Sequence, residues 1–181
     1  MEIREITKIV TDVLAFLTVV GGVSVVVGLL SLIPQIKKFE VVSRVHSYIA
    51  HHATALSGFF ALLAMLGSLY YSDIAGYNPC KFCWYQRIFM YPIVFLAITG
   101  LVKKESAMQY IVTLSAIGAP IAVYHYLLQR GVVEATDCAV VGYSASCSST
   151  FFMEYGYITI PMMALTVFAM ILVIALIGKK N

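Results

Sequence analysis

The sequence predicts an all-α integral membrane protein with five membrane-spanning helices. Of its 181 residues, 61% are hydrophobic and 12% are charged, which is about half the charged share of a typical soluble domain. The apolar residues fall into five runs of about 20 residues, the length of helix that crosses the roughly 30 Å hydrocarbon core of a bilayer. A helix satisfies its own backbone hydrogen bonds in lipid, whereas an open sheet does not. Spans and short loops use up the chain, so we expect no separate soluble catalytic domain.

The spans are expected at residues 13–33, 53–71, 84–102, 110–129 and 157–177. The first run is longer than the apolar core of a signal peptide, and no small-residue cleavage site follows it, so it is interpreted as an uncleaved span. Its glycines, Gly21, Gly22 and Gly28, give it a face suited to close helix packing. The segment 34–52 is polar enough to lie along the membrane surface.

The basic residues of the loops indicate the orientation of the chain. Seven lie on one side of the predicted spans: Lys37, Lys38, Arg44, Lys103, Lys104, Lys179 and Lys180. The other side has fewer, Arg4, Lys8, Lys81 and Arg130, together with most of the acidic residues. Because positive residues accumulate on the cytoplasmic side, the N-terminus is expected outside and the C-terminus inside. All four cysteines then lie on the extracytoplasmic side, where disulfides form and persist.

The first cysteine pair opens the third span, in the run Asn78-Pro79-Cys80-Lys81-Phe82-Cys83. Cysteines three apart at a helix start share one face of the helix. The free N–H groups and the partial positive charge of a helix N-terminus favour the reactive thiolate. The C-x-x-C spacing also occurs in zinc sites and in structural disulfides. Its place at the outer mouth of a membrane helix favours redox chemistry.

Two polar residues inside spans complete the first candidate site. Arg87 lies one turn deeper than Cys83 on the same side of the helix. There it could provide a hydrogen-bond donor or a counter-charge for the polar headgroup of a ligand held beside Cys83. The alternative is that its side chain extends to the headgroups of the membrane lipids. His125 is expected at similar depth in the fourth span, with a role in binding a ligand or handling a proton. A buried neutral histidine bonded to a neighbouring helix is the alternative. Gly118 and Pro120 below it are expected to open room for a ring.

The second cysteine pair, Cys138 and Cys147, lies in the loop 131–155, which is rich in glycine and serine. A disulfide in a short exposed loop is accessible to an attacking thiolate and suits exchange; a structural clip is the alternative. Eight residues separate these cysteines, wider than the usual spacing in zinc sites, so no metal is expected. The net charge of +3, with no basic cluster interleaved with aromatics, predicts no nucleic-acid partner.

These residues give the sequence a specific resemblance. The run Pro79-Cys80-Lys81-Phe82-Cys83-Trp84-Tyr85-Gln86-Arg87, continuing to Pro92, resembles the disulfide bond formation protein B (DsbB) family, in particular its compact BdbC-type members. Further similarity lies in Met65–Tyr70, in Tyr124-His125-Tyr126-Leu127, in Cys138 and Cys147, and in Ile158-Thr159-Ile160-Pro161. The resemblance covers roughly residues 50–177.

The resemblance implies a fold and a function. It implies a DsbB-type four-helix transmembrane bundle at residues 46–181, with 1–45 as an extra N-terminal transmembrane helix and a cytoplasmic connector. It implies a membrane thiol:quinone oxidoreductase in the cell membrane. Such a protein re-oxidises an extracytoplasmic thioredoxin-fold dithiol oxidase (DsbA-like) and passes the electrons to ubiquinone or menaquinone in the lipid bilayer. Disulfide formation in other proteins depends on this relay.

The resemblance also implies residue roles. Cys83 is similar to the cysteine next to the quinone and Cys80 to its disulfide partner, while Arg87 and His125 match residues near the quinone. Cys138 is similar to the cysteine that the partner attacks, with Cys147 as its mate. We therefore expect a cleft between the third and fourth spans in which Cys83 meets a lipid-borne acceptor.

Two other functions are left open by the sequence. The vitamin K epoxide reductase family performs related chemistry, but its loop cysteines precede its C-x-x-C, which is the reverse of the order here. The other alternative is a non-catalytic membrane scaffold whose cysteines form structural disulfides.

Overall fold

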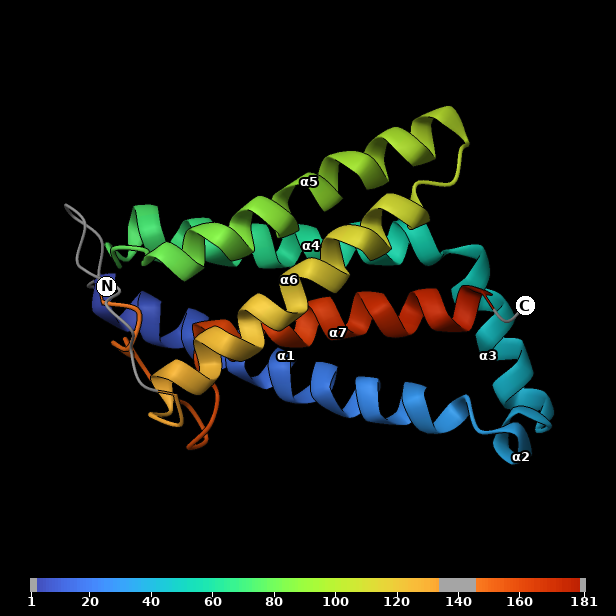
Figure 1. Cartoon of the computed structure of the whole chain (residues 1–181), viewed down its shortest axis with the longest axis horizontal. Coiled ribbons are helices and arrows are strands. Elements are labelled where there is room, and N and C mark those ends of the chain that lie inside the picture. Colours follow the sequence, from blue (N-terminus) through green and yellow to red (C-terminus); the bar gives the residue numbers. More distant parts are fainter. Residues whose placement is uncertain (1–2, 134–145, 180–181) are drawn as a thin grey trace.

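The computed structural model describes residues 3–133 and 146–179, which form helices joined by loops and contain no β-strand. In chain order the elements are α1 (Ile3–Ser31), α2 (Pro34–Lys37), α3 (Glu40–His51), α4 (Ala53–Leu69), η1 (Tyr70–Ile74), α5 (Lys81–Lys103), α6 (Met108–Gln129) and α7 (Ile160–Lys179). The element η1 is one turn of π-helix that continues α4. Figure 1 shows the five long helices running side by side in one bundle.

The five predicted spans are confirmed, because five helices are long and apolar enough to cross a membrane. The last four have bounds within three residues of those expected. The first begins earlier, at Ile3 instead of residue 13. Its polar first turns are retained in the helix because the hydroxyls of Thr7 and Thr11 lie 3.1 Å from those of Tyr70 and Tyr71. These contacts give the polar residues partners within the protein.

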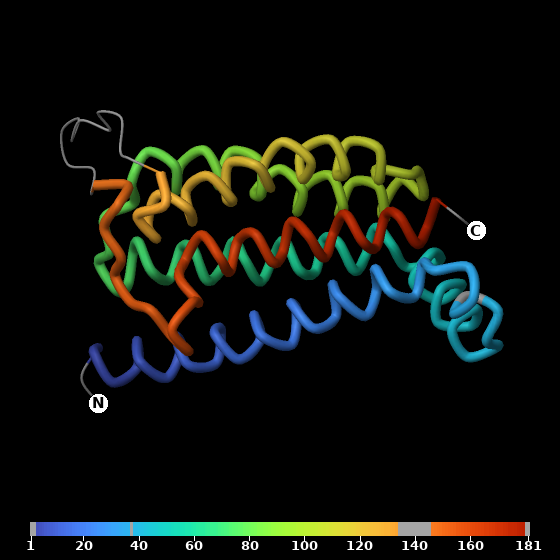
Figure 2. Tube along the Cα trace, turned by 60° about the horizontal axis from the view of Figure 1, so that its bottom comes forward, coloured from blue at the N-terminus to red at the C-terminus, as the bar shows by residue number. Residues whose placement is uncertain are grey.

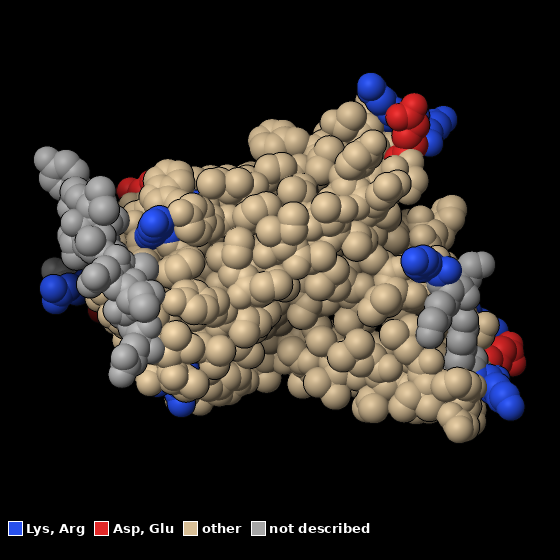
Figure 3. Space-filling model, viewed as in Figure 1, with Lys and Arg blue, Asp and Glu red and all other residues tan. Residues whose placement is uncertain are grey.

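The charged residues gather at the two ends of the bundle, and on the face seen in Figure 3 the surface between the ends shows none. This distribution is that of a multi-pass membrane protein. One end holds α2, α3, the α5–α6 turn and the end of α7, while the other holds the start of α1 and the loops that carry Cys80 and Cys147 (Figures 1 and 2). The segment predicted to lie at the surface, 34–52, contains the short helices α2 and α3.

Helix α7 lies in the middle of the bundle, in contact with α1, α3, α4 and α6 (Figure 2). Its Phe168 and Ile171 are fully buried in the main apolar core. Helix α6 comes close to α7 at Gly118, where an added Cβ would lie 2.3 Å from the Phe168 ring. The room expected at Gly118 is therefore filled by Phe168, and that prediction is wrong.

Candidate functional site

Cys80 and Cys83 form a dithiol at the N-terminus of α5. Cys80 is the N-cap residue, and its Sγ accepts a hydrogen bond from the backbone N–H of Cys83 at 3.4 Å. The two sulfur atoms lie 3.2 Å apart, with the Cys80 thiol donating to the Cys83 sulfur, and both residues are free cysteines in this structure. Cys80 is buried and Cys83 is partly exposed. The pair is positioned to interconvert between dithiol and disulfide.

The hydrogen bond to Cys83, together with burial, raises the pKa of Cys80 from its ordinary value of 9.0 to about 12. Cys80 therefore keeps its proton at neutral pH and is the donor of the pair. The sulfur of Cys83, as acceptor, is the one free to react.

We expect iodoacetamide to label Cys83 before Cys80 in the reduced, folded protein at pH 8. Only the thiolate reacts, and a thiol with a pKa of about 12 is thiolate in about one molecule in ten thousand at that pH. Peptide mass spectrometry reads out the modified position, and the denatured protein, in which both cysteines react, is the control. Labelling of Cys80 first would show that the hydrogen bond runs in the opposite direction.

His125 on α6 lies between Cys80 and Gln86 and is 1% exposed. Its Nε2 is 3.4 Å from Cys80 Sγ, and its Nδ1 is 2.9 Å from Nε2 of Gln86. The Phe82 ring lies 5.7 Å from the imidazole, centroid to centroid. The histidine thus contacts the dithiol on its buried side, and Gln86 fixes the orientation of the ring.

The ligand atoms of Cys80, Cys83 and His125 all lie within 4.8 Å of one another, so among the residues that the structure describes this group could hold a metal ion. Two thiolates on one tetrahedral zinc ion, with Zn–S bonds of about 2.3 Å, are separated by roughly 3.8 Å. The sulfur atoms here are closer, at 3.2 Å. This spacing favours a dithiol that forms a disulfide over a zinc site.

Arg87 lies inside the bundle and is held by α4. Its Nε donates to Ser68 Oγ at 2.9 Å and its Nη2 to the Ser68 carbonyl at 3.0 Å. The guanidinium lies over the Trp84 ring, with Cζ 5.1 Å from the centroid. In the described ranges Nη1 has no hydrogen-bond partner, and no carboxylate forms an ion pair with Arg87. Arg87 therefore presents an uncompensated positive charge and a free donor.

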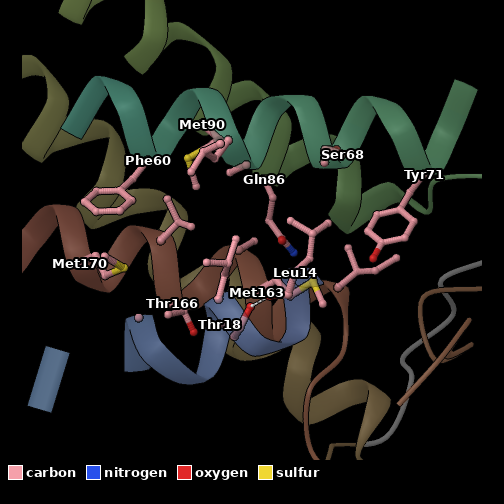
Figure 4. Close-up of a pocket in the computed structure, with 18 of the residues that line it drawn as sticks. Leu14, Thr18, Phe60, Ser68, Tyr71, Gln86, Met90, Met163, Thr166 and Met170 are labelled. Atoms are coloured by element: carbon pink, nitrogen blue, oxygen red, sulfur yellow. Dashed lines mark hydrogen bonds between the residues drawn. The ribbon is translucent and has the colours of Figure 1, made fainter. Parts of the chain in front are cut away.

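That charge faces an apolar pocket of about 260 Å³ bounded by α1, α4, α5 and α7 (Figure 4). Cys83, Gln86 and Arg87 line it from α5. In Figure 4 the side chain of Gln86 extends into the space between α4 and α1. A cavity of about 150 Å³ is enough to hold benzene, so this pocket has room for a substituted ring and part of a chain.

The pocket is not where the sequence predicted it. It lies beside α1, α4 and α7, whereas a cleft was expected between the third and fourth spans, α5 and α6. His125 is not one of its lining residues. The reason is packing: Phe82 and the Gln86–His125 contact fill the outer part of the α5–α6 interface, and Phe168 fills the space at Gly118. Cys83 and Arg87 reach the pocket from the other side of α5.

The second cysteine pair is described in part. Cys147 is 2% exposed and packs in one cluster with Cys80 and Leu128. Two hydrogen bonds tie the flanking loop to the end of α6, from Gln129 Nε2 to the Ser149 carbonyl at 3.0 Å and from Arg130 Nη1 to the Gly156 carbonyl at 2.9 Å. Cys138 lies outside the described residues, so its predicted role stays a prediction. A sulfur of the second pair therefore lies beside the first pair.

Three stacked aromatic rings cover the outer end of the pocket. Tyr77 stacks on Phe151 at 4.6 Å and on Tyr71 at 5.7 Å, nearly parallel in both cases. Under them is a small cavity of about 30 Å³ that also touches Cys83 and Arg87, enough for about one water molecule. The rings therefore border the space next to Cys83 and Arg87.

Two residues of the site had no role in the sequence analysis, although both lie in the motifs that carry the resemblance. Ser68 anchors Arg87, and Gln86 joins His125 to the pocket. A polar side chain within an apolar span is costly unless it has a partner or a function. The presence of these two polar residues within apolar spans was therefore the feature of the sequence that could have identified both.

The fold and the site together define a class: a multi-pass membrane protein with a pair of closely spaced cysteines at the start of a membrane-spanning helix. The family model described as "Disulfide bond formation protein DsbB" matches residues 50–178. The chain belongs to this family, as its motifs predicted, and its role is in disulfide bond formation. Family membership makes it an oxidoreductase.

Individual relatives agree with the family model. The chain is 40% identical over 118 residues to "Probable disulfide formation protein C" of Halalkalibacterium halodurans, a match that covers 65% of this chain and 85% of the relative. It is 39% identical over 126 residues to "Disulfide bond formation protein C" of Bacillus subtilis, covering 67% and 89%. A "Probable disulfide formation protein" of Deinococcus radiodurans is 36% identical over 126 residues, covering 65% and 82%. No solved structure matches the chain significantly.

Proposed function

We propose that the chain is a thiol:quinone oxidoreductase that re-oxidises an extracytoplasmic thioredoxin-fold dithiol oxidase and passes the electrons to a membrane quinone. One observation carries the proposal. Cys83, whose sulfur is 3.2 Å from that of Cys80, lines an apolar pocket within the bundle together with Arg87. A structural disulfide in a scaffold needs neither a pocket beside the sulfur nor an uncompensated arginine.

The distribution of basic residues supports an orientation for this relay. The end of the bundle that holds α2, α3 and the α5–α6 turn carries Arg44, Lys103 and Lys104. By the positive-inside rule that end is cytoplasmic. The dithiol and Cys147 at the other end then face the extracytoplasmic side, where a soluble partner can reach the protein.

The residues of the pocket fit a quinone. Most of its lining is apolar, which suits the ring and tail of a lipid-soluble molecule, and Arg87 Nη1 is a free donor for a ring oxygen. A quinone held there would supply an acceptor for two electrons and two protons. Arg87 stabilises negative charge that develops on an oxygen beside it, an effect that is strong where water is excluded.

The cysteines provide the path for electrons. The partner's dithiol loses two electrons and two protons and becomes a disulfide, while a disulfide of this chain becomes a dithiol. We assign the first contact to Cys138, by the family resemblance, and its mate Cys147 lies in the same cluster as Cys80. Exchange between the two pairs then needs little movement. His125 accepts at Nδ1 from the Gln86 amide, so its Nε2 carries the ring proton and, 3.4 Å from Cys80 Sγ, can donate to that sulfur and stabilise its thiolate when Cys80 reacts.

The test is turnover by the purified protein in proteoliposomes under anaerobic conditions. We expect a reduced thioredoxin-fold dithiol protein to be oxidised and ubiquinone or menaquinone to be reduced, one quinone for each disulfide formed. The absorbance of the quinone and thiol labelling of the partner measure the two sides separately. Absence of quinone reduction with both quinone types would overturn the proposal, and net reduction of the partner by added quinol would favour a reductase of the vitamin K epoxide reductase kind.

A further inference from the structure

Helix α1 forms one wall of the pocket that contains Cys83, although it lies outside the residues that the family model matches, 50–178. Six of its residues line the pocket: Leu14, Leu17, Thr18, Val20, Gly21 and Ser24. In Figure 4, Leu14 and Thr18 come from α1 and face the space into which Gln86 extends. This wall is therefore supplied by a segment outside the part of the chain that the family model matches.

This wall is fastened to the bundle along α7 and at its outer end. An added Cβ at Gly21 would lie 2.9 Å from Thr166 and Met170, and one at Gly28 would lie 2.6 Å from Val173, so α1 and α7 are in close contact. At the outer end, the Tyr71 hydroxyl donates to Thr11 at 3.1 Å. The contacts of α1 are mainly with α7, and its contacts with α4 are few. A wall held this way keeps its place while leaving the α4 side less tightly packed.

The pocket opens on that less tightly packed side. Leu17 and Val20 of α1 and Leu63 of α4 line the pocket and are also 47%, 46% and 37% exposed, respectively. These exposed side chains belong to both helices that border the pocket, which indicates that the pocket meets the surface between α1 and α4. Since all three are apolar and lie within membrane-spanning helices, the opening faces the hydrocarbon of the bilayer.

The pocket is also long. Its lining follows α4 from Ser68, which holds Arg87, to Phe60, and eight residues of helix measure roughly 12 Å. One end therefore has the sulfur of Cys83 and the charge of Arg87, and the other is lined mainly by apolar side chains, among them Phe60 and Val20. The hydroxyls of Ser24 and Thr166, which also line the pocket, donate to backbone carbonyls of their own helices. This polarity matches a molecule with a polar redox-active ring and an apolar tail.

We propose that α1 and α4 bind the tail of the lipid-borne quinone, which enters and leaves through the opening between Leu17 and Val20 on one side and Leu63 on the other. The inference rests on the proposed function, which places the ring at Cys83 and Arg87. Because α1 encloses the tail, the affinity of the protein for a quinone depends on the length of the quinone's tail. Helix α1 thus adds a binding surface to the four-helix bundle. An ordinary phospholipid chain in the same space would instead make affinity independent of the quinone's tail.

Trp84 provides a readout other than activity. It is the single tryptophan of the chain, and its ring lies against Arg87, 5.1 Å from Cζ to centroid. A quinone ring beside Arg87 quenches its fluorescence, so titration of the reduced protein in nanodiscs gives a dissociation constant. The probes are a ring-only quinone and its decyl-tailed counterpart, of whichever ring type the wild type reduces.

The variant Val20→Phe fills the opening from α1. We expect it to raise the dissociation constant for the decyl-tailed quinone about tenfold, as displacement of about two buried methylene groups would, and to leave that for the ring-only quinone unchanged. Leu63→Phe should reproduce this from α4. Val23→Phe is the matched control, because Val23 lies on the same helix, is 58% exposed and does not line the pocket.

The outcomes separate the two proposals. Equal dissociation constants for the tailed quinone in Val20→Phe, Leu63→Phe and Val23→Phe would overturn the role of α1, as would a wild type that binds tailed and ring-only quinones equally well. Unchanged binding of the ring-only quinone shows that each variant is folded. Failure of the wild type to reduce or bind any quinone would instead overturn the proposed function itself.

Discussion

We expect Cys83→Ser to reduce quinone turnover to the rate measured without protein. Cys83 is the cysteine of the first pair that lines the pocket, whereas Cys80 is 3% exposed and does not. A hydroxyl has nearly the size of a thiol but forms no disulfide, so electrons from Cys80 have no route to the pocket. The measurement is quinone absorbance with a reduced thioredoxin-fold dithiol protein as donor.

The control for this variant is quinone binding, followed by quenching of Trp84 fluorescence. Binding should persist in Cys83→Ser, because Arg87 and the apolar lining are unchanged. Cys80→Ser should also lose turnover while it retains binding, since the dithiol needs both sulfurs. If Cys83→Ser retained turnover, the sulfur nearest the pocket would not be the electron donor, and the assignment of Cys83 would be wrong.

We expect Arg87→Ala to raise the KM for quinone by about 10- to 100-fold, the loss of a charge-assisted hydrogen bond of about 1.5–3 kcal/mol. The free Nη1 and the position of Arg87 at the pocket are the reasons. Thiol exchange with the soluble partner, measured in a single turnover without quinone, should be unaffected. Arg44→Ala is the matched control, because it removes an arginine whose side chain is 81% exposed in an ion pair with Glu40.

Arg87 also joins α5 to α4 through Ser68, so loss of this anchor could by itself lower activity. The variant Ser68→Ala removes one of the two hydrogen bonds and keeps the charge. We expect its KM to change much less than that of Arg87→Ala. Equal effects of the two variants would mean that Arg87 acts only by holding the helices together.

The sequence predicted those parts of the molecule that depend on local pattern. The length of the apolar runs gave five spans, and the C-x-x-C spacing at a helix start placed Cys80 and Cys83 on one face, with Arg87 one turn deeper. These features need only the geometry of a single helix. Family membership was likewise readable from a contiguous motif, and the family model confirms it.

The pairing of helix faces was not predictable in the same way. His125 and Arg87 are at similar depth, but depth does not determine rotation about a helix axis. His125 faces Cys80 and Gln86, and Arg87 faces Ser68 on α4. Rotation is set by packing between helices, such as the approach of Phe168 to Gly118. For the same reason, the sequence did not place α1 at the pocket, although its glycines indicated a packing face.

The burial of Cys147 has a consequence for the order in which the cysteines can exchange electrons. Cys147 is 2% exposed and lies in the same cluster as Cys80. A folded protein in solution therefore cannot contact its sulfur, whereas Cys80 lies next to it. In the proposed relay, reducing equivalents from a soluble partner would therefore enter at another atom and pass to Cys80 through Cys147. Steric shielding of this kind would fix the order of the exchange steps and keep unrelated thiols in solution from reacting with Cys147 directly.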